Sequence, residues 1–480
     1  MKLWRSPRGT GDHPRSSTNG RSTEPSGFSL ARLVEEAGDP HPLYARTVNP
    51  QFVRLLRTIG FDKRWTRAEG SYVEDADGTR YLDLLGGFGM FALGRNNPQV
   101  RAALEEALAL DTPGSVQLGL SPLSGLLARE LLARVPSRLG RVAFTSSGTE
   151  AVEAALKLGR AATGRSRVLS VEGAFHGLTL GSLSANGCED FTEPFHPLLP
   201  GFDRVPFNDL RALERELARE DVALFLVEPV QGKGVVLPLP GYLEGAQELC
   251  RRYGTLFVVD EVQTGLGRTG KLFAFEHFGL EPDVVTISKA LSGGYVPSGA
   301  CVLRAEVFDS VFDSLEHAVR HGSTFAPNDL AMSAGLAVLH ELDEHDLAAR
   351  AKRLGDALLE ATRPLVERYE VVRDVRGLGL MWAIEFGEPE RGSRSWRVLE
   401  RVQEGMFAQL VVGPLFHEHQ MLTQVAGHRL NVLKILPPLT IAETDLARFA
   451  ETLDDVVRRA QRIPRAAARM ALRAGPRLVG

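Results

Sequence analysis

The chain has 480 residues, of which 44% are hydrophobic, so it is long enough for roughly two or three domains around a large core. Its 56 basic and 60 acidic residues leave a net charge of -4, and this balance favours neither nucleic acid nor an acidic partner. Cys188, Cys250 and Cys301 are widely spaced and form neither a metal-binding pattern nor a disulfide framework, and no window approaches the ~20 apolar residues of a membrane span. We therefore expect a soluble protein of the reducing cytoplasm, without a metal site.

The N-terminal region begins with a polar stretch and continues into short regular elements. Residues 1–27 are rich in Arg, Ser, Gly and Pro and lack the apolar core of a secretory signal, so we expect a flexible arm. A helix and a loop are expected over 30–58. The segments 70–74 and 78–83, which are joined by an Asp-Ala-Asp-Gly turn, predict a β-hairpin.

The middle of the chain alternates short apolar runs with helical patterns. Helices are expected over 98–110 and 152–161, and a later one ends near residue 340. The apolar runs, which we expect to be strands, are 142–145, 168–171, 223–227, 256–259, 284–287 and 300–303. This alternation predicts an α/β domain whose mostly parallel sheet has helices on both faces. Ligands of such sheets bind outside the carboxyl ends of the strands.

A polar side chain follows four of these runs, namely Ser147, Glu228, Asp260 and Lys289. A lysine amine at the end of a buried strand can attack a carbonyl because desolvation lowers its pKa, so Lys289 is the candidate Schiff-base anchor of an aldehyde cofactor. Asp260 could face a pyridinium nitrogen and keep it protonated. Taken alone, each pattern also fits a structural interpretation: solvated lysines after strands are far commoner than reactive ones, and Asp260 also fits a helix cap or a turn.

The turn 146–151, which contains a glycine beside small hydroxyl residues, lies between the first of these strands and the helix that follows it. Free N–H groups and the positive end of the helix dipole make such a turn suitable for a phosphate, around Gly148 and Thr149. The same residues also fit an ordinary helix N-cap.

The final third of the chain changes pattern and predicts a smaller α+β domain. The expected helices are 347–366, 395–408 and 443–459, and the expected strands are 369–375, 380–386 and 432–435. The arginine-rich end fits a solvated tail better than a contact with an anionic partner or a membrane. The predicted organisation is a flexible arm 1–27, an N-terminal part of the small domain 28–95, a large domain 96–342, a C-terminal small domain 343–460 and a basic tail 461–480.

The stretches DEVQTGLGRTG (260–270) and SKALSGG (288–294), at this separation, resemble the class III, ornithine-aminotransferase-like family of pyridoxal-phosphate enzymes. The resemblance covers about residues 49–459 and looks nearest to diamine transaminases such as putrescine aminotransferase. It implies a fold-type I transferase with pyridoxal 5'-phosphate on Lys289. It also implies transfer of an amino group from a terminal amine or an amino acid to a 2-oxo acid.

Roles for individual residues follow from the resemblance at matching positions. Lys289 and Asp260 become the catalytic pair, because the freed lysine moves the proton of the reaction and the aspartate holds the pyridine nitrogen. The other implied cofactor contacts are Ser147, Gly148 and Thr149 at the phosphate, Phe175 and Val262 on the two ring faces, Gln263 at the ring hydroxyl, and His176 in support. Thr324 matches a threonine that binds the phosphate of the neighbouring subunit, so an obligatory homodimer is implied.

Three residues are expected on the substrate side. Phe88, in the glycine-rich corner 86–91, matches a substrate-side aromatic but also fits a core residue. Glu228 is expected to face the substrate side of the cofactor. Lys434 takes the place where many relatives carry an arginine that grips the α-carboxylate through a planar fork. Either Lys434 binds a carboxylate as a point charge or it faces solvent.

Lys233 matches the glutamate that swings onto this arginine in ornithine-type relatives. Two facing lysines would repel each other unless an anion or Glu228 lay between them, so we expect weaker or altered recognition of 2-oxoglutarate, with pyruvate or another acceptor serving comparably. Arg376 and Arg429 are candidates for compensation, although neither aligns with the gripping position.

Two other functions fit the sequence. The same scaffold supports aminomutases, decarboxylases and phospholyases, and a binding protein that has lost the chemistry is a third reading. Intact Lys289 and Asp260 argue against the last of these.

Overall fold

The computed structural model describes residues 28–113, 119–390, 392, 396–397, 400–401, 405–427 and 430–461. The chain forms two compact units, residues 1–64 and 65–480. The expected arm 1–27 and nearly all of the expected basic tail lie outside the described residues. The finer division into domains stays a prediction.

The described part of the first unit consists of three short helices, where the sequence predicted a helix and a loop. They are α1 (Leu30–Ala37), α2 (Pro40–Thr47) and α3 (Pro50–Ile59). The side chains of Ser29, Asp39 and Asn49 each accept a hydrogen bond from an N–H group in the first turn of the following helix. In α2 and in α3, the cap residue is followed by a proline at the first helical position. Proline favours this position because it has no N–H group that would need a hydrogen-bond acceptor.

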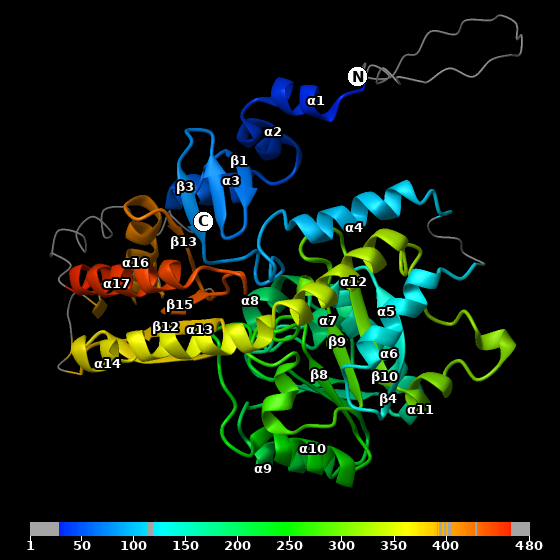
Figure 1. Ribbon diagram of the computed structural model, residues 1–480. Helices are drawn as coiled ribbons and strands as arrows, with labels where there is room; N and C mark the ends of the chain where they lie inside the picture. The colour runs from blue at the N-terminus through cyan, green and yellow to red at the C-terminus, as the bar shows by residue number, and fades with distance from the viewer. Residues whose placement is uncertain are drawn as a thin grey trace, which may run out of the picture. The chain divides into compact units, whose positions relative to one another are not determined.

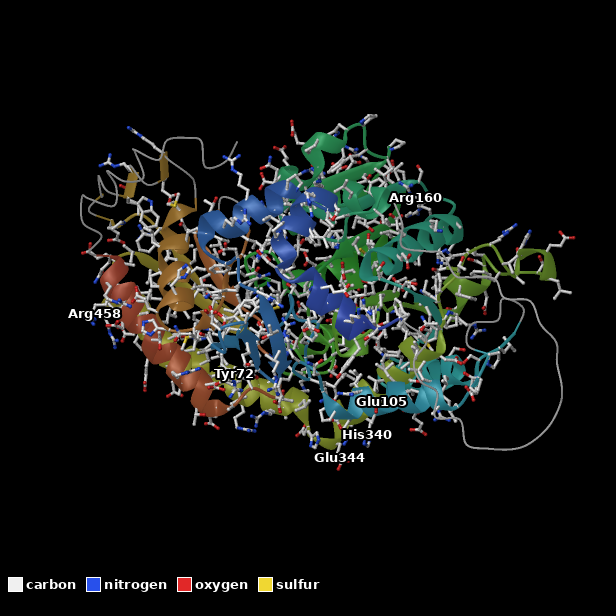
Figure 2. All side chains as sticks on the ribbon, turned by 90° about the horizontal axis from the view of Figure 1, so that it is seen from above. Tyr72, Glu105, Arg160, His340, Glu344 and Arg458 are labelled. Atoms are coloured by element: carbon white, nitrogen blue, oxygen red, sulfur yellow. The ribbon has the colours of Figure 1, made fainter. Side chains whose placement is uncertain are left out.

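The second unit begins with a small sheet of strand order β1-β2-β3-β13. The strands are β1 (Trp65–Glu69), β2 (Tyr72–Asp75), β3 (Arg80–Asp83) and β13 (Met421–Leu422). The predicted hairpin is confirmed, with Tyr72 opposite Leu82. The hydroxyl of Tyr72, labelled in Figure 2, donates to Asp445 at 2.6 Å and so joins this sheet to the last helix, α17 (Glu443–Ala460).

A seven-stranded sheet forms the centre of the second unit, in the order β4-β10-β9-β8-β7-β5-β6. Its strands are β4 (Leu139–Thr145), β5 (Arg167–Val171), β6 (Phe202–Val205), β7 (Val222–Val227), β8 (Leu256–Asp260), β9 (Val284–Ile287) and β10 (Gly299–Arg304). Strand β10 runs antiparallel to β4 and β9, and the other six strands all run in one direction. This arrangement confirms the predicted mostly parallel α/β sheet. The sequence missed β6, because its FDRV stretch carries two charged residues.

Helices surround this sheet (Figure 1). They are α4 (Pro98–Ala109), α5 (Pro122–Leu132), α6 (Gly148–Thr163), α7 (Leu180–Ser184), α8 (Glu189–Thr192), α9 (Leu210–Leu217), α10 (Tyr242–Arg252), α11 (Ala305–Asp309) and α12 (Asp329–Glu344), with 3-10 turns η1 (Glu193–Phe195), η2 (Ala274–Phe278), η3 (Lys289–Ser292) and η4 (Leu315–His317). Every residue of β7 is buried; Leu224 and Leu226 pack in one cluster with α6. Because neighbouring strand residues point to opposite faces, both faces are covered.

The C-terminal part of the second unit contains the sheet β11-β12-β15-β14. Its elements are α13 (Leu347–Thr362), α14 (Pro364–Arg368), β11 (Val372–Leu378), β12 (Met381–Phe386), α16 (Met406–His417), β14 (Gln424–Val425) and β15 (Val432–Ile435), and α17 follows. The prediction of one helix over 347–366 is wrong, because Pro364 cannot continue the hydrogen bonding of α13. Of the helix predicted over 395–408, the described residues 396–397, 400–401 and 406–408 are helical, whereas Gly405 is not. The sequence missed the continuation of α16 to His417, because Gly413 and Pro414 lie within it.

None of the described helices is long and apolar enough to cross a membrane. Among the described residues, no group of three or more His, Cys, Asp or Glu side chains could bind a metal ion.

Candidate active site

The candidate active site lies at the carboxyl ends of the parallel strands. Because β4, β5, β7, β8 and β9 run in one direction, the residues that follow them meet at one edge of the sheet. Ser147 follows β4, Phe175 and His176 follow β5, Glu228 follows β7, Asp260 ends β8, and Lys289 follows β9 and begins η3. The sequence therefore placed these polar groups at the correct ends of the correct strands.

Asp260 is buried and accepts three hydrogen bonds or close polar contacts. Its Oδ2 lies 2.7 Å from Nδ1 of His176, and its Oδ1 accepts from Thr286 Oγ1 and from the N–H of Val262, each at 3.0 Å. The bond to Val262 is a turn contact, so the structural interpretation of Asp260 is correct in part. The histidine and threonine fix the carboxylate beyond what a turn requires.

Lys289 lies beside two carboxylates at the start of η3. Its backbone adopts φ = 42°, in the left-handed region that non-glycine residues seldom occupy. Burial lowers the pKa of the Lys289 amine, and the nearby Asp260 and Glu228 partly offset that effect. A lysine in this environment differs from a solvated surface lysine and has a larger fraction of neutral, nucleophilic amine.

Glu228 connects two loops of the site. Its Oε1 accepts from the N–H of Gly232 at 2.8 Å, and its Oε2 accepts from the N–H of Phe175 at 3.1 Å. Burial raises the pKa of Glu228, while His176 and these two N–H groups lower it. The glutamate thus holds the loop after β5 against the loop after β7.

The turn before α6 fits a phosphate group. Ser147 is an N-cap whose side chain accepts from the N–H of Glu150 at 3.3 Å, so the N-cap interpretation is correct for this residue. Among the described residues, the N–H groups of Gly148 and Thr149 have no hydrogen-bond acceptor, and the buried Oγ of Ser146 has no partner. These donors at a helix N-terminus suit an anion.

Steric contacts make Gly148 necessary in this turn. A Cβ atom at residue 148 would lie 2.9 Å from Val262 Cγ1 and 3.2 Å from Ser288 Cβ. The hydroxyl of Thr149 lies 2.7 Å from Oγ1 of Thr179, which anchors the turn from the other side. Gly148, Val262 and Ser288 therefore meet from three different elements.

One of the residues expected around a cofactor ring has a hydrogen-bond acceptor that is not used. The buried Oε1 of Gln263 has no hydrogen-bond partner in the described part of the chain, whereas its Nε2 donates to the Phe88 carbonyl at 3.1 Å. An unpaired buried acceptor fits the ring hydroxyl of pyridoxal phosphate. The ring of Phe175 packs edge-on against Phe191, with centroids 5.2 Å apart.

Two of the predicted site residues lie at the surface of the single chain. Phe88 is 51% exposed and has φ = 60°, so the alternative that it is a core residue is wrong. Thr324 is also exposed. Their exposure matches residues that face a substrate opening or a neighbouring chain.

Lys434 is buried at the site. It lies on β15, is 4% exposed, and its Nζ donates to the carbonyl of Gly232 at 2.7 Å. Burial, together with the neighbouring charge of Lys289, lowers the pKa of Lys434 to about 8, although Glu228 opposes the shift. The alternative that Lys434 faces solvent is wrong.

Lys233 does not face Lys434. Its Nζ donates to Cys188 Sγ at 2.6 Å and lies 3.8 Å from Asp190 Oδ2. The expectation of two facing lysines is therefore wrong, because the side chain of Lys233 turns toward the region of α8. This contact could not be predicted from the sequence, since Cys188 lies far from Lys233 along the chain.

Arg376, a candidate for compensation, is held by other partners. It donates to the carbonyls of Gly234 and Val235 at 2.8 and 2.9 Å and pairs with Asp374 and Glu385. This arginine clamps the loop that contains Lys233. Arg429 lies outside the described residues.

The sequence also missed residues that support the site. Thr286 lies within the apolar run of β9 and contacts Asp260, and the Oδ1 of Asn186 accepts from the N–H of His176 at 2.6 Å. A polar residue inside a fully buried strand is a usable signal for Thr286. Asn186 lies in an irregular segment and carried no such signal.

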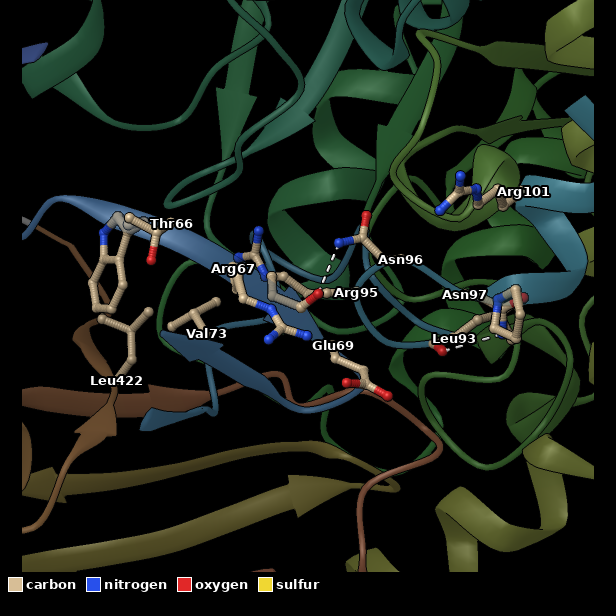
Figure 3. A pocket seen from close by; sticks show the side chains of 14 residues that line it. Thr66, Arg67, Glu69, Val73, Leu93, Arg95, Asn96, Asn97, Arg101 and Leu422 are labelled. Atoms are coloured by element: carbon tan, nitrogen blue, oxygen red, sulfur yellow. Dashed lines mark hydrogen bonds between the residues drawn. The ribbon is translucent and has the colours of Figure 1, made fainter. Parts of the chain in front are cut away.

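A separate hollow of about 930 Å³ lies between β1 and the start of α4 (Figure 3). Charged side chains line it, among them Arg67, Glu69, Arg95 and Arg101. No predicted site residue lines this hollow.

Comparisons with known proteins agree with this geometry. Aminotransferase PigE from Serratia sp. is 37% identical over 447 residues, which are 86% of this chain and 52% of the relative. The chain thus spans about half the length of that curated relative.

Solved structures are similar over most of their length. Ornithine aminotransferase from Toxoplasma gondii ME49 is 31% identical, with a TM-score of 0.74 over 82% of this chain and 90% of that chain. A PLP-bound amine transaminase from an uncultivated Pseudomonas species is 30% identical, with a TM-score of 0.72 over 83% and 95%. The omega transaminase from Pseudomonas jessenii in complex with PMP is 26% identical, with a TM-score of 0.77 over 85% and 94%.

The family model for aminotransferase class-III matches residues 61–457. This match confirms the resemblance seen in the sequence, the fold-type I architecture and pyridoxal phosphate as the family's cofactor. The closer likeness to putrescine aminotransferase stays a prediction. The chain belongs to the class III aminotransferases.

Proposed function

We propose that this chain is a pyridoxal-phosphate-dependent transaminase that moves an amino group from an amine or amino acid, including a terminal amine of a diamine, to a 2-oxo acid. The observation that carries this proposal is the buried Lys289 amine, which feels the charges of Asp260 and Glu228 at the carboxyl ends of β7, β8 and β9. An amine with a lowered pKa beside buried carboxylates is suited to carbonyl chemistry.

The bound cofactor would supply an electron sink next to the reacting carbon. Lys289 would hold the cofactor and, once released by an incoming amine, would take a proton from the substrate carbon and return it to the cofactor side. Asp260, oriented by His176 and Thr286, would keep the pyridine nitrogen charged.

The rest of the cofactor would be held by the turn before α6 and by residues around the ring, several of which have polar groups without partners among the described residues. The N–H groups of Gly148 and Thr149, with Ser147 as the cap of α6, would bind the phosphate. Phe175 and Val262 would enclose the ring, and Gln263 would contact the ring hydroxyl. Support for this arrangement comes from the unpaired Oε1 of Gln263 and from the close approach of Val262 to Gly148.

The substrate side would be formed by Phe88, Glu228 and Lys434. Lys434 offers a single ammonium where an arginine would offer a planar fork, and its one hydrogen bond in the described chain goes to Gly232. We propose that it binds the carboxylate of the 2-oxo acid as a point charge. Recognition of 2-oxoglutarate would then be weaker than in arginine-bearing relatives, and pyruvate would serve comparably.

The active form would be a homodimer in which Thr324 of one chain contacts the phosphate bound by the other. Large exposed apolar side chains that lie close to Thr324 in the sequence support this proposal: Phe325 is 73%, Val319 85% and Leu315 97% exposed. Such surfaces on a folded chain are usually covered by a partner. The three free cysteines favour a reducing compartment, which we take to be the cytoplasm.

Spectroscopy with amine donors tests the proposal. The protein loaded with pyridoxal phosphate is reduced with borohydride, and the labelled peptide is expected to contain Lys289. Amine donors should then convert the unreduced cofactor to its amine form, which only a 2-oxo acid restores. A decarboxylase, mutase or phospholyase would turn over without an acceptor, and a silent binding protein would show no conversion.

A further inference from the structure

The amine of Lys233 and the thiol of Cys188 form a close pair near the substrate side. Their N–S distance of 2.6 Å is shorter than the lower limit of about 2.7 Å for ordinary N–H···O bonds, although sulfur is larger than oxygen. The Asp190 carboxylate lies 3.8 Å from the amine and 3.7 Å from the sulfur, and the Phe191 ring centroid lies 5.1 Å from the amine. The sulfur, the carboxylate and the aromatic ring therefore surround the Lys233 amine and keep it close to Cys188.

Cys188 is the accessible thiol of the chain. The chain has three cysteines, all among the described residues; Cys188 is partly exposed, whereas Cys250 and Cys301 are buried. Burial raises the pKa of both buried thiols, which keeps them in the unreactive protonated form. Only Cys188 combines access to solvent with a neighbouring amine, and the other two serve as internal controls.

The pair is coupled to the substrate side through one peptide unit. Gly232, which precedes Lys233, donates its N–H to Glu228 and accepts from Lys434 at its carbonyl. Phe191, under the Lys233 amine, packs against Phe175. A covalent change at Lys233 would therefore reach three of the residues that the proposed function places around the substrate and cofactor.

We propose that Cys188 and Lys233 are a peroxide-responsive modification site at which the two side chains become joined by an N–S bond. This proposal rests on the geometry of the pair and does not require the proposed transaminase activity. It assigns the pair a reaction with small peroxides, which reach a partly exposed thiol more readily than bulky oxidants do.

The reaction takes place in two balanced steps. In the first, the Cys188 sulfur attacks one oxygen of hydrogen peroxide, so that the O–O bond breaks, an S–O bond forms and the sulfur is oxidised to a sulfenic acid. The leaving hydroxide takes the thiol proton and departs as water. In the second, the Lys233 amine attacks that sulfur, so that the S–O bond breaks, the N–S bond forms and water leaves with a proton from the amine. The second step needs no further oxidant.

Mass spectrometry of the full-length protein tests the proposal. After treatment with hydrogen peroxide and digestion without reductant, the peptides of Cys188 and Lys233 should be joined, at a mass about 2 Da below their sum. A thiol reductant should separate them again, and Cys250 and Cys301 should remain unmodified thiols.

The matched variant is Lys233→Arg, which keeps the positive charge but removes the nucleophilic amine. In this variant the sulfenic acid at Cys188 should persist and be captured by dimedone, whereas wild-type protein should give the linked peptides. If wild-type Cys188 stays a thiol, or advances to sulfinic acid without linking to Lys233, the proposal is wrong. Because the readout is covalent mass, loss of transaminase activity would not affect it.

Discussion

The two sides of the candidate site differ in how closely they follow the family pattern. On the cofactor side, Lys289 and Asp260 stand where the class III motifs place them, and His176 and Thr286 fix the aspartate. On the substrate side, the resemblance predicts that Lys434 and Lys233 take the places of an arginine and a glutamate. If the proposed function is correct, the chemistry is kept on one side while recognition of the acceptor carboxylate changes on the other.

The physical difference between the sides is the kind of charge that each holds. The side proposed for the cofactor presents a carboxylate and backbone N–H groups. The side proposed for the substrate presents the Lys434 amine, whose pKa of about 8 lies within the working range of many enzymes. Loss of Lys289 or Asp260 should therefore lower turnover strongly, whereas changes on the substrate side should alter selectivity and pH dependence.

The largest effect is expected for Lys289→Ala. Loss of the amine removes both the covalent anchor and the proton carrier, so turnover should fall by about 1,000-fold or more. The measurement is kcat at saturating donor and acceptor, together with loss of the borohydride-fixed label. The exposed Lys271→Ala is the matched control and should keep normal activity. An active Lys289→Ala enzyme would contradict the proposed role of Lys289 as cofactor anchor and proton carrier.

The next largest effect is expected for Asp260→Ala. Without its carboxylate the pyridine nitrogen would be less often protonated, so the rate should fall roughly 100-fold, the scale of losing one preorganised electrostatic group. Stopped-flow absorbance of the donor half-reaction measures this rate, and the melting temperature reports whether the fold survives. Near-normal activity would mean that Asp260 is only a turn residue.

A smaller effect, on KM, is expected from the titration of Lys434. Its amine is charged below about pH 8 and neutral above it, so KM for a 2-oxo acid should rise as the pH increases through that value. Lys434→Arg should remove this rise, because arginine stays charged, and should lower KM for 2-oxoglutarate by about tenfold. A pH profile of KM for wild-type protein that matches the arginine variant would contradict a titrating lysine.

The smallest effect is expected for Thr324→Ala. Loss of one hydrogen bond to a charged phosphate should weaken cofactor binding by roughly tenfold, as measured by cofactor titration of the apoprotein. Mixed dimers that combine Thr324→Ala with Lys289→Ala chains should regain one intact site and part of the activity. Absence of any complementation would contradict a shared site.

The sequence predicted the central sheet well for a physical reason. The runs that form β7, β8 and β9 are apolar and buried on both faces, so they are visible without knowledge of the fold. Elements with mixed patterns were missed or misplaced, such as β6 and α16. The end of a strand also determines where the backbone of the next residue lies. For this reason Asp260 and Lys289 could be assigned to one edge of the sheet from the sequence.

Side-chain direction was the part that the sequence could not provide. Lys434 and Lys233 were expected to face each other, because the arginine and the glutamate at the matching positions of ornithine-type relatives do so. The structure instead pairs Lys434 with the Gly232 carbonyl and Lys233 with Cys188, contacts between residues far apart in the chain. A family pattern carries over the position of a residue more safely than its contacts when the residue type has changed.

The most direct test is the acceptor half-reaction. Enzyme carrying the amine form of the cofactor is mixed with 2-oxoglutarate or with pyruvate, and the return of the aldehyde absorbance is followed for wild-type protein and for Lys434→Ala. We expect the two acceptors to react with kcat/KM values within about tenfold of each other, equivalent to ~1.4 kcal/mol, and we expect Lys434→Ala to weaken the use of both. Strongly preferred use of 2-oxoglutarate that survives Lys434→Ala would contradict the account.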